Sequence, residues 1–195
     1  AGEGDPVVFA PTRDNFFGGT LKGITGKIPY LKDLGVQGIY LNPIFQSPSN
    51  HRYDTVDYAK IDPLLGNEDD FRQLVGSLHE AGLRIMLDGV FNHCAWNHPF
   101  WQDVLHKGES SPYYEWFYIE DAHTLEGSGK EKFSPEIIRR EHPFACFAFA
   151  ANMPKWNTEN ELVMDYLIGR AERWTRDFGI DAWRLDVPDE ISMRF

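Results

Sequence analysis

An arginine and an aspartate stand two positions apart in the run GIDAWRLDVPDE, which covers residues 179–190. The apolar residues around them predict a strand, and residues two apart on a strand share one face, so Arg184 and Asp186 should point to the same side. An arginine beside a partly buried carboxylate favours the ionised form of that carboxylate, which is the state that a nucleophile or an electrostatic stabiliser needs. The pair alone fits a structural ion pair equally well, because such pairs also occur without catalysis.

Polar side chains also follow two earlier apolar runs. The run DGVFNH contains Asp88, Asn92 and His93, and the run SPSNHRYDTVDY, which comes after Asn42, places Tyr53 at the centre of a polar loop. Each has an ordinary explanation, since a lone histidine is more often a packing or capping residue than a catalyst. Three polar segments after three successive strands are harder to explain singly, because the carboxyl ends of such strands share one rim.

Helices and strands alternate in the order that would bring these segments to one rim. Apolar residues at intervals of three and four predict helices that end at Gly35, Gly82 and Gly179, where a left-handed residue can close a helix. The helices are expected over residues 21–34, from the cap Asn67 to residue 81, and over residues 158–178 after a capping box of Thr158 and Glu161; the strands that follow are expected over 36–43, 83–90 and 180–187. Helix, glycine and strand repeated three times predict an α/β fold with βα units around a parallel sheet.

A long insertion, residues 94–157, separates the second and third of these units and is rich in tryptophan, tyrosine and phenylalanine. It follows the carboxyl end of a strand, where α/β proteins place their ligand-binding loops. Carboxylates and amides bond hydroxyl groups, and rings stack on the apolar faces of sugars. A neutral saccharide is therefore the ligand class that this set of residues favours.

The composition excludes several other classes of function. The 195 residues are 42% hydrophobic, which is enough for a packed domain, and the formal net charge of −11 would repel nucleic acid and anionic membranes. The sequence has no apolar run of about 18 residues and no signal-like N-terminus, so no membrane span is expected. Cys94 and Cys146 form no C-x-x-C pattern and are expected to be free thiols. These points favour a cytoplasmic location, with the periplasm and secretion left open.

The same segments resemble the motifs of one enzyme family. DGVFNH is similar to the motif that ends strand three of the α-amylase superfamily, glycoside hydrolase family 13, and WRLDV is similar to its nucleophile motif at the end of strand four. Three further segments resemble the neopullulanase, cyclomaltodextrinase and maltogenic amylase branch of that superfamily: MPKWN at residues 153–157, DNFFGG at 14–19, and SPSNHRYDT. The resemblance implies a partial TIM (β/α)8 barrel of about three βα units, strands two to four, with an inserted domain B after strand three. Residues 1–93 and 158–195 would belong to the barrel and residues 94–157 to domain B.

The resemblance also assigns roles to the polar residues. Asp186 would be the nucleophile that forms a glycosyl-enzyme ester, and Arg184 would hold it ionised and oriented. His93 and Asp88 would serve the sugar ring at the cleaved residue, and Tyr53 would stack on that ring. The implied activity is hydrolysis of an α-glucan, such as starch, a maltooligosaccharide, a cyclomaltodextrin or pullulan, with retention of the α configuration.

Two further positions match the family. Asn92 corresponds to a position used for calcium in some relatives; in this branch no cofactor is required, and calcium is possible there but is not predicted. Glu190 lies where the branch has a glutamate that faces the acceptor side. The branch has Ala-Asn-Glu after the LDV of its nucleophile motif, whereas this chain has Pro188, Asp189 and Glu190, so its loop should be stiffer.

A retaining glycosidase needs a second carboxyl group about 5 Å from the nucleophile. In the family that group is a glutamate at the end of strand five, and a further aspartate ends strand seven. Residue 195 comes just after strand four, so the chain is expected to be a fragment of a catalytic domain that is inactive on its own. The expected partner is an α-glucan oligosaccharide, with no nucleic acid or membrane, and a homodimer is one option for the intact protein.

Other readings differ in how they use these residues. A transglycosylase of the same superfamily shares the glycosyl-enzyme and differs in the acceptor. Non-catalytic members keep the barrel and lose the acids, although Arg184, Asp186 and His93 together argue against that class. A metal-dependent hydrolase fails on spacing, because no H-E-x-x-H or comparable ligand pair occurs.

Overall fold

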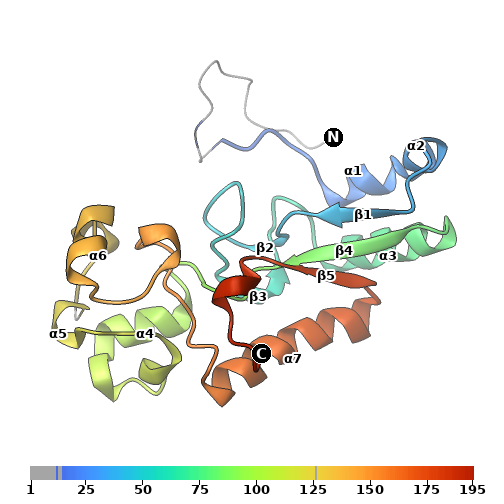
Figure 1. Ribbon diagram of the computed structural model, residues 1–195. Helices are drawn as coiled ribbons and strands as arrows, with labels where there is room; N and C mark the ends of the chain where they lie inside the picture. The colour runs from blue at the N-terminus through green and yellow to red at the C-terminus, as the bar shows by residue number, and fades with distance from the viewer. Residues whose placement is uncertain (1–11, 13–14, 126) are drawn as a thin grey trace. The chain divides into compact units, whose positions relative to one another are not determined.

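A computed structural model describes residues 12, 15–125 and 127–195, and the chain divides into two compact units. Unit one contains Ala1–Arg52, Asp57–Gly89 and Arg170–Arg184, and unit two contains Tyr53–Val56, Val90–Gly169 and Leu185–Phe195. Asp14, the first residue of the DNFFGG motif, lies outside the described residues. Figure 1 labels the helices α1 (Leu21–Thr25), α2 (Ile28–Asp33), α3 (Glu68–Glu80), α4 (Pro99–Lys107), α5 (Ala122–Leu125), α6 (Pro135–Glu141) and α7 (Glu161–Phe178), and the strands β1 (Gly38–Leu41), β2 (Phe45–Gln46), β3 (Asp57–Ile61), β4 (Arg84–Gly89) and β5 (Ala182–Leu185). None of the described helices is long and apolar enough to cross a membrane.

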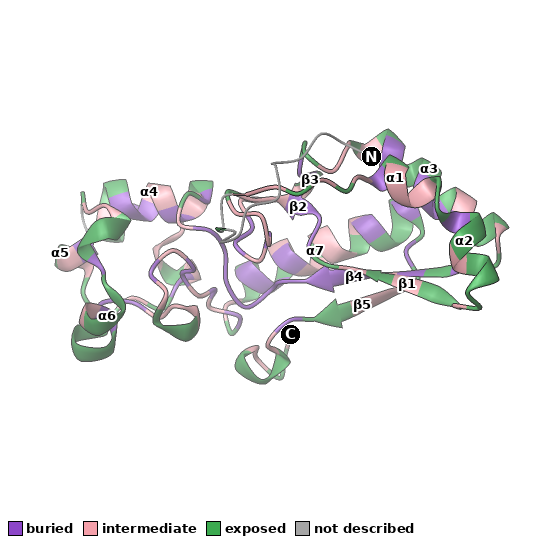
Figure 2. Ribbon diagram, turned by 90° about the horizontal axis from the view of Figure 1, so that it is seen from above, coloured by how far each residue is buried: buried purple, intermediate pink, exposed green. Residues whose placement is uncertain are grey.

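Unit one is built on a three-stranded sheet in the order β1-β4-β5 (Figure 1). Strands β1 and β4 run parallel, in a register that sets Gly38 opposite Arg84 and Leu41 opposite Leu87. The middle strand β4 is mostly buried, whereas the residues of β1 and β5 are half-buried or exposed (Figure 2). Parallel strands that each follow a helix confirm the α/β class predicted from the sequence.

The first predicted helix is interrupted. The sequence predicted one helix over residues 21–34, but the chain forms α1 and α2 with Gly26 and Lys27 between them. Pro29 explains the break, because it has no N–H to donate and its ring would clash with the carbonyl of Thr25 in a continuous helix. Pro29 lies instead in the first turn of α2, where that N–H would have no partner in the helix.

A short antiparallel pair of strands, β2 and β3, was not predicted. Phe45 lies opposite Ile61 and Gln46 opposite Asp57, with an irregularity between the two pairs. The polar letters of SPSNHRYDTVDY predicted only a loop, but Tyr58 is fully buried and its carbonyl oxygen accepts a hydrogen bond of 2.8 Å from Nε1 of Trp174. A partner 116 residues away in the chain therefore contributes to this strand, and local sequence could not show it.

The core of unit one lies between α3 and the end of α7. The Asn67 side chain accepts a hydrogen bond of 3.0 Å from the N–H of Asp70, and the Asp70 carboxylate accepts one of 3.2 Å from the N–H of Asn67. This capping box fixes the start of α3, as the sequence predicted for Asn67. Phe71 of α3 then packs against Trp174 and Phe178 of α7, with ring centroids 5.6 and 5.5 Å away. Aromatic contacts at these distances bury a large apolar area.

The start of α7 differs from the prediction. Thr158 was expected to cap the helix, but its hydroxyl accepts a hydrogen bond of 2.9 Å from the N–H of Ser192. Asn160 takes the capping role, because its side-chain oxygen accepts a hydrogen bond of 2.9 Å from the N–H of Leu162. The helix therefore begins at Glu161 rather than at residue 158.

Unit two has a core of aromatic rings and little regular strand. Trp101 and Trp156 are fully buried, and Phe117 packs between them, stacked on Trp156 at 4.7 Å and edge-on to Trp101 at 4.9 Å. Isolated backbone bridges, among them Cys146 with Pro154, tie neighbouring segments together. Cys94 and Cys146 are free thiols, as predicted. The limits expected for domain B, residues 94–157, stay a prediction.

Candidate functional site

Asp88 and Arg184 form an ion pair in unit one. The Asp88 side chain, on β4, is fully buried, and Nη1 of Arg184, on β5, donates to its two carboxylate oxygens at 3.0 and 3.1 Å. The hydroxyl of Tyr40, on β1, also donates to this carboxylate. Hydrogen bonds to an ionised group are strong and directional, so the three side chains hold one another in place. The predicted bond of Arg184 to Asp186 stays a prediction.

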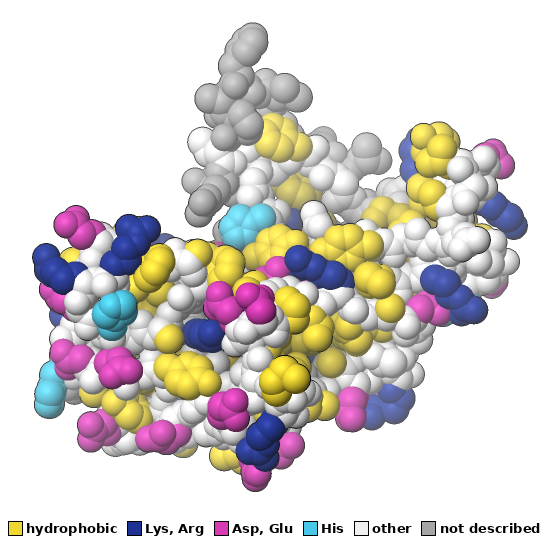
Figure 3. All heavy atoms as spheres, viewed as in Figure 1, with side chains coloured by type: hydrophobic (Ala, Val, Ile, Leu, Met, Phe, Trp, Pro, Cys, Tyr) yellow, Lys and Arg dark blue, Asp and Glu magenta, His cyan; other side chains and the backbone are white. Residues whose placement is uncertain are grey.

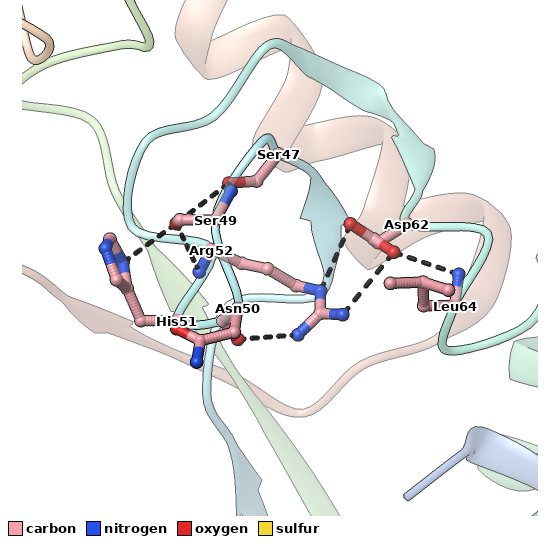
Figure 4. Close-up of polar contacts among 7 residues, drawn as sticks. All are labelled: Ser47, Ser49, Asn50, His51, Arg52, Asp62 and Leu64. Carbon is pink, nitrogen blue, oxygen red and sulfur yellow. Dashed lines mark hydrogen bonds and ion pairs between the residues drawn. The ribbon is translucent and has the colours of Figure 1, made fainter. Parts of the chain in front are cut away.

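The loop that precedes Tyr53 in the chain is fastened by a second buried ion pair (Figure 4). Arg52 and Asp62 are 6% and 3% exposed, and Nε of Arg52 lies 3.2 Å from Oδ2 of Asp62. Arg52 also donates a hydrogen bond of 2.8 Å to the carbonyl oxygen of Asn50, and Asp62 accepts one of 2.9 Å from the N–H of Leu64. The backbone of Arg52 is left-handed, with φ of 60°, which is unfavourable for a residue other than glycine. The contacts of its side chain offset that strain.

Asp186 lies in unit two, immediately after β5, and is 9% exposed. The sequence predicted a strand as far as residue 187, but Val187 adopts a left-handed conformation with φ of 48° and ψ of 52°. That conformation is strained both for a β-branched residue and for a residue before proline. Pro188 then opens a 3-10 turn in which the N–H of Glu190 donates to the carbonyl oxygen of Val187 at 3.1 Å. Backbone strain of this kind is concentrated at functional sites.

His93 is buried in unit two with both ring nitrogens bonded. Its Nε2 lies 3.0 Å from the carbonyl oxygen of Tyr53, and its Nδ1 lies 3.3 Å from the amide nitrogen of Asn92. These partners assign the proton to Nε2, which donates, and leave Nδ1 as the acceptor. Burial lowers the pKa of His93, although the nearby charge of Asp186 acts in the opposite direction. The ring of Phe147 stacks on the imidazole with centroids 4.8 Å apart, so the orientation of the His93 ring is fixed.

Asn92 connects His93 to Glu190. Its amide nitrogen lies 3.4 Å from Oε2 of Glu190, and the same oxygen accepts from Nζ of Lys155 at 3.2 Å. A backbone bridge also pairs His93 with Lys155. Four of the predicted site residues, Tyr53, Asn92, His93 and Glu190, thus belong to one hydrogen-bonded group in unit two.

Asn92 matches the position that some family members use for calcium. The side-chain oxygen of Asn92 is buried, and no described residue donates to it. Calcium takes about six to eight oxygen ligands. Within the described ranges, no three histidine, cysteine, aspartate or glutamate side chains are grouped so that they could hold a metal ion.

Three neighbours of the site residues were not predicted: Tyr40, Phe147 and Lys155. Tyr40 stands two positions before Asn42, so the strand period could have placed it on the same face. Lys155 belongs to the MPKWN motif, which had served only to identify a branch of the family. Phe147 is one of many rings in the insertion, and nothing in the sequence distinguished it from the others.

The surface over the sheet combines apolar and charged groups. Tyr40 is 44% exposed and the Arg184 side chain is 42% exposed. Figure 3 shows hydrophobic side chains open to solvent over the region of β1, β4 and β5, with acidic and basic side chains beside them. Rings that can stack on a sugar, next to groups that bond its hydroxyls, suit a saccharide ligand.

Comparison with known proteins gives a family for this chain. A family model described as "Alpha amylase, catalytic domain" matches residues 3–195. The intracellular maltogenic amylase of Bacillus subtilis (strain 168) is 48% identical over 185 residues, which cover 95% of this chain and 29% of that protein. The cyclomaltodextrinase of Geobacillus thermopakistaniensis is 46% identical, again over 95% of this chain and 29% of its own length.

A solved structure has the same fold over most of the chain. The cyclic α-maltosyl-(1→6)-maltose hydrolase of Arthrobacter globiformis superposes with a TM-score of 0.81 at 37% identity, over 93% of this chain and 38% of that one. Together with the sheet and helices of unit one, these matches confirm that the fold is part of a (β/α)8 barrel. The chain spans less than a third of the length of the two relatives named above.

Proposed function

This chain belongs to the α-amylase catalytic-domain family, and on that basis we propose that it supplies the nucleophile part of the active site of a retaining α-glucan hydrolase. Its relatives are named as a maltogenic amylase, a cyclomaltodextrinase and a hydrolase of a cyclic maltosyl-maltose, which supports α-glucosidic bonds as the bonds cleaved. Because the chain spans 29% of the first of these relatives, the proposal concerns a longer protein that contains it.

In the proposed reaction the Asp186 carboxylate attacks the anomeric carbon, and the glycosidic oxygen leaves with a proton from a second carboxyl group. Water later displaces Asp186 from the ester, so the α configuration is retained. Arg184 and Asp88 act as one hydrogen-bonded unit that orients the site. His93 donates to the carbonyl oxygen of Tyr53 and so fixes the residue whose ring would stack on the substrate.

The observation that carries the proposal is the setting of Asp186 in unit two. The carboxylate is 9% exposed and close to His93, whose pKa is lowered by burial. A neutral imidazole does not cancel the negative charge of Asp186. In this proposal the negative charge of Asp186 stabilises the positive charge that develops on the sugar in an oxocarbenium-like transition state.

The first test is covalent labelling of the full-length protein with a 5-fluoro α-glucosyl fluoride, followed by intact mass and peptide mapping. Fluoride leaves without protonation, so labelling depends on the nucleophile and a formed pocket. We expect one adduct on Asp186, none in Asp186→Asn, and a normal adduct in Asp189→Asn, which alters an exposed carboxylate three residues away. An adduct on a different carboxylate, or no adduct in the wild type, would refute the role of Asp186.

A second test addresses the substrate and the stereochemistry. The full-length protein should release reducing sugar from maltotriose, a cyclomaltodextrin or pullulan, and proton NMR of the first product should show the α anomer. A β anomer as first product would exclude a retaining mechanism. The ratio of hydrolysis to transfer products, measured with glucose as added acceptor, separates a hydrolase from a transglycosylase.

A further inference from the structure

Asp88 stands on the middle strand of the sheet, with one partner on each side. The strand order is β1-β4-β5, so Tyr40 approaches from β1 and Arg184 from β5. Tyr40 lies opposite Met86 in the register, and Asp88 is two positions further along β4, on the same face as Met86. The hydroxyl at the end of the tyrosine ring reaches this carboxylate diagonally across the two strands.

The two partners hold Asp88 in different ways. Arg184 approaches from β5 and reaches both carboxylate oxygens with Nη1. The Tyr40 hydroxyl approaches from β1, on the other side of β4, and donates to Oδ2, so it restrains the carboxylate from a second direction. Because the Asp88 side chain is fully buried, water cannot easily take the place of the lost donor.

The Tyr40 ring itself is only half-buried. It is 44% exposed, whereas the carboxylate that it bonds is fully buried. A tyrosine kept mainly for packing would bury its ring and leave its hydroxyl in water. At Tyr40 the ring is partly exposed and the hydroxyl bonds a buried carboxylate. The hydrogen bond, rather than the packing of the ring, is therefore the main contact of this residue.

We propose that Tyr40 is a positioning residue of the glycosidase reaction: its hydroxyl fixes the Asp88 carboxylate and, through it, the guanidinium of Arg184. This inference rests on the function proposed above and adds a residue to it. Tyr40 makes no contact with the reacting atoms in this role. Tyr40 acts through Asp88, so the loss of the Tyr40 hydroxyl should have little further effect on kcat once the Asp88 carboxylate has been replaced.

The test is a double-mutant cycle on the full-length protein, with kcat and KM measured for an activated α-maltoside. Tyr40→Phe keeps the ring and removes the hydroxyl, and it should lower kcat about tenfold while KM changes less than about twofold. In the Asp88→Asn background the same change should alter kcat less than about twofold. Tyr30→Phe, at a tyrosine of α2 that is 61% exposed, is the matched control and should have wild-type kinetics.

The outcomes separate the inference from the function on which it rests. A wild type without glycosidase activity overturns the proposed function. An active wild type with unchanged kcat in Tyr40→Phe overturns only the role of Tyr40, and so does a tenfold loss that repeats in the Asp88→Asn background. A thermal midpoint that falls in parallel with kcat would mean a structural role and also count against the proposal. If Asp88→Asn does not fold, Arg184→Lys provides the second arm of the cycle.

Discussion

The buried pair of Arg52 and Asp62 gives a stability prediction in which two effects have opposite signs. Arg52→Gly removes the guanidinium and leaves the Asp62 carboxylate, which is 5% exposed, without its cation. The same substitution places glycine at a φ of 60°, where arginine is strained. The net change in the free energy of unfolding decides which effect is larger.

The magnitude follows from the two contributions. Removal of one partner from a buried ion pair costs about 3–5 kcal/mol, because the other charge stays buried without compensation. Relief of a left-handed non-glycine residue returns about 1 kcal/mol. Arg52→Gly should therefore destabilise the fold by about 2–4 kcal/mol. In Arg52→Gly/Asp62→Asn the uncompensated charge is gone and an oxygen still accepts from the N–H of Leu64, so most of the loss should be recovered.

Thermal unfolding of the full-length protein, followed by far-UV circular dichroism, measures this effect. In a domain of about 150–250 residues, about 1 kcal/mol corresponds to roughly 2–4 °C in Tm, and a larger domain shifts less, so Arg52→Gly should melt below the wild type by at most roughly 16 °C. Arg176→Ala is the control, since Arg176 pairs with Asp177 at the surface and has a side chain that is 71% exposed. Loss of that pair should cost less than about 1 kcal/mol.

Two results would refute the reasoning. If Arg52→Gly is as stable as the wild type, backbone strain at this position outweighs the buried pair. If the double variant is no more stable than Arg52→Gly, the single variant does not lose stability through the uncompensated charge of Asp62. In that case the bond of Arg52 to the carbonyl oxygen of Asn50 is the remaining contact to examine.

Three further predictions concern single residues. Burial lowers the pKa of His93 below 6.5, so the unfolded state binds more protons than the folded state as the pH falls through 6.5, and the free energy of unfolding should decrease. His93→Asn should flatten this pH dependence of stability, measured by urea titrations between about pH 7 and pH 5. An unchanged slope of stability against pH in His93→Asn would contradict the prediction. Burial raises the pKa of the Cys94 thiol and raises the pKa of Cys146 to about 11. An aromatic disulfide reagent should therefore modify both thiols slowly in the folded protein at about pH 8 and rapidly in urea. Fast modification of the folded protein would contradict the burial of these thiols. Asn67→Ala should lower the free energy of unfolding by about 1 kcal/mol, because the helix α3 loses its N-cap hydrogen bond. Chemical denaturation measures this change, and equal stability of the variant and the wild type would contradict the prediction.

The order of elements could be predicted because its signals are local. Gly35, Gly82 and Gly179 follow helices and have φ values of 83°, 78° and 73°, which is the left-handed conformation expected at a helix end. Strands β2 and β3 could not be predicted, since Tyr58 is held by Trp174 from a distant part of the chain. Pro29 alone could have predicted the break between α1 and α2. It was missed because apolar residues continue at helical spacing on both sides of Pro29.

In the candidate site, too, the residue types could be predicted from local sequence, but the contacts between distant residues could not. Asp88, His93 and Arg184 could be identified as candidates because charged and imidazole groups are unusual at the ends of apolar runs. Their pairing could not be predicted, because Arg184 and Asp88 lie 96 residues apart and their contact depends on the strand order. Tyr40 was missed for a different reason. A tyrosine in an apolar run reads as core, and only its hydrogen bond to a buried carboxylate distinguishes it.

The aromatic core of unit two also makes this part of the chain visible to spectroscopy. Of the six tryptophans, Trp96, Trp101, Trp116 and Trp156 belong to unit two, and Trp96 and Trp101 lie 5.7 Å apart with their rings at 71°. Rings fixed in asymmetric packing produce near-UV circular dichroism, and the signal disappears when tertiary packing is lost even if helices remain. The near-UV spectrum of this chain should therefore contain a large contribution from unit two. A ligand or substitution that erases this signal but spares the far-UV spectrum would loosen the ring-rich unit while the backbone structure persists, and it could be detected without any added label.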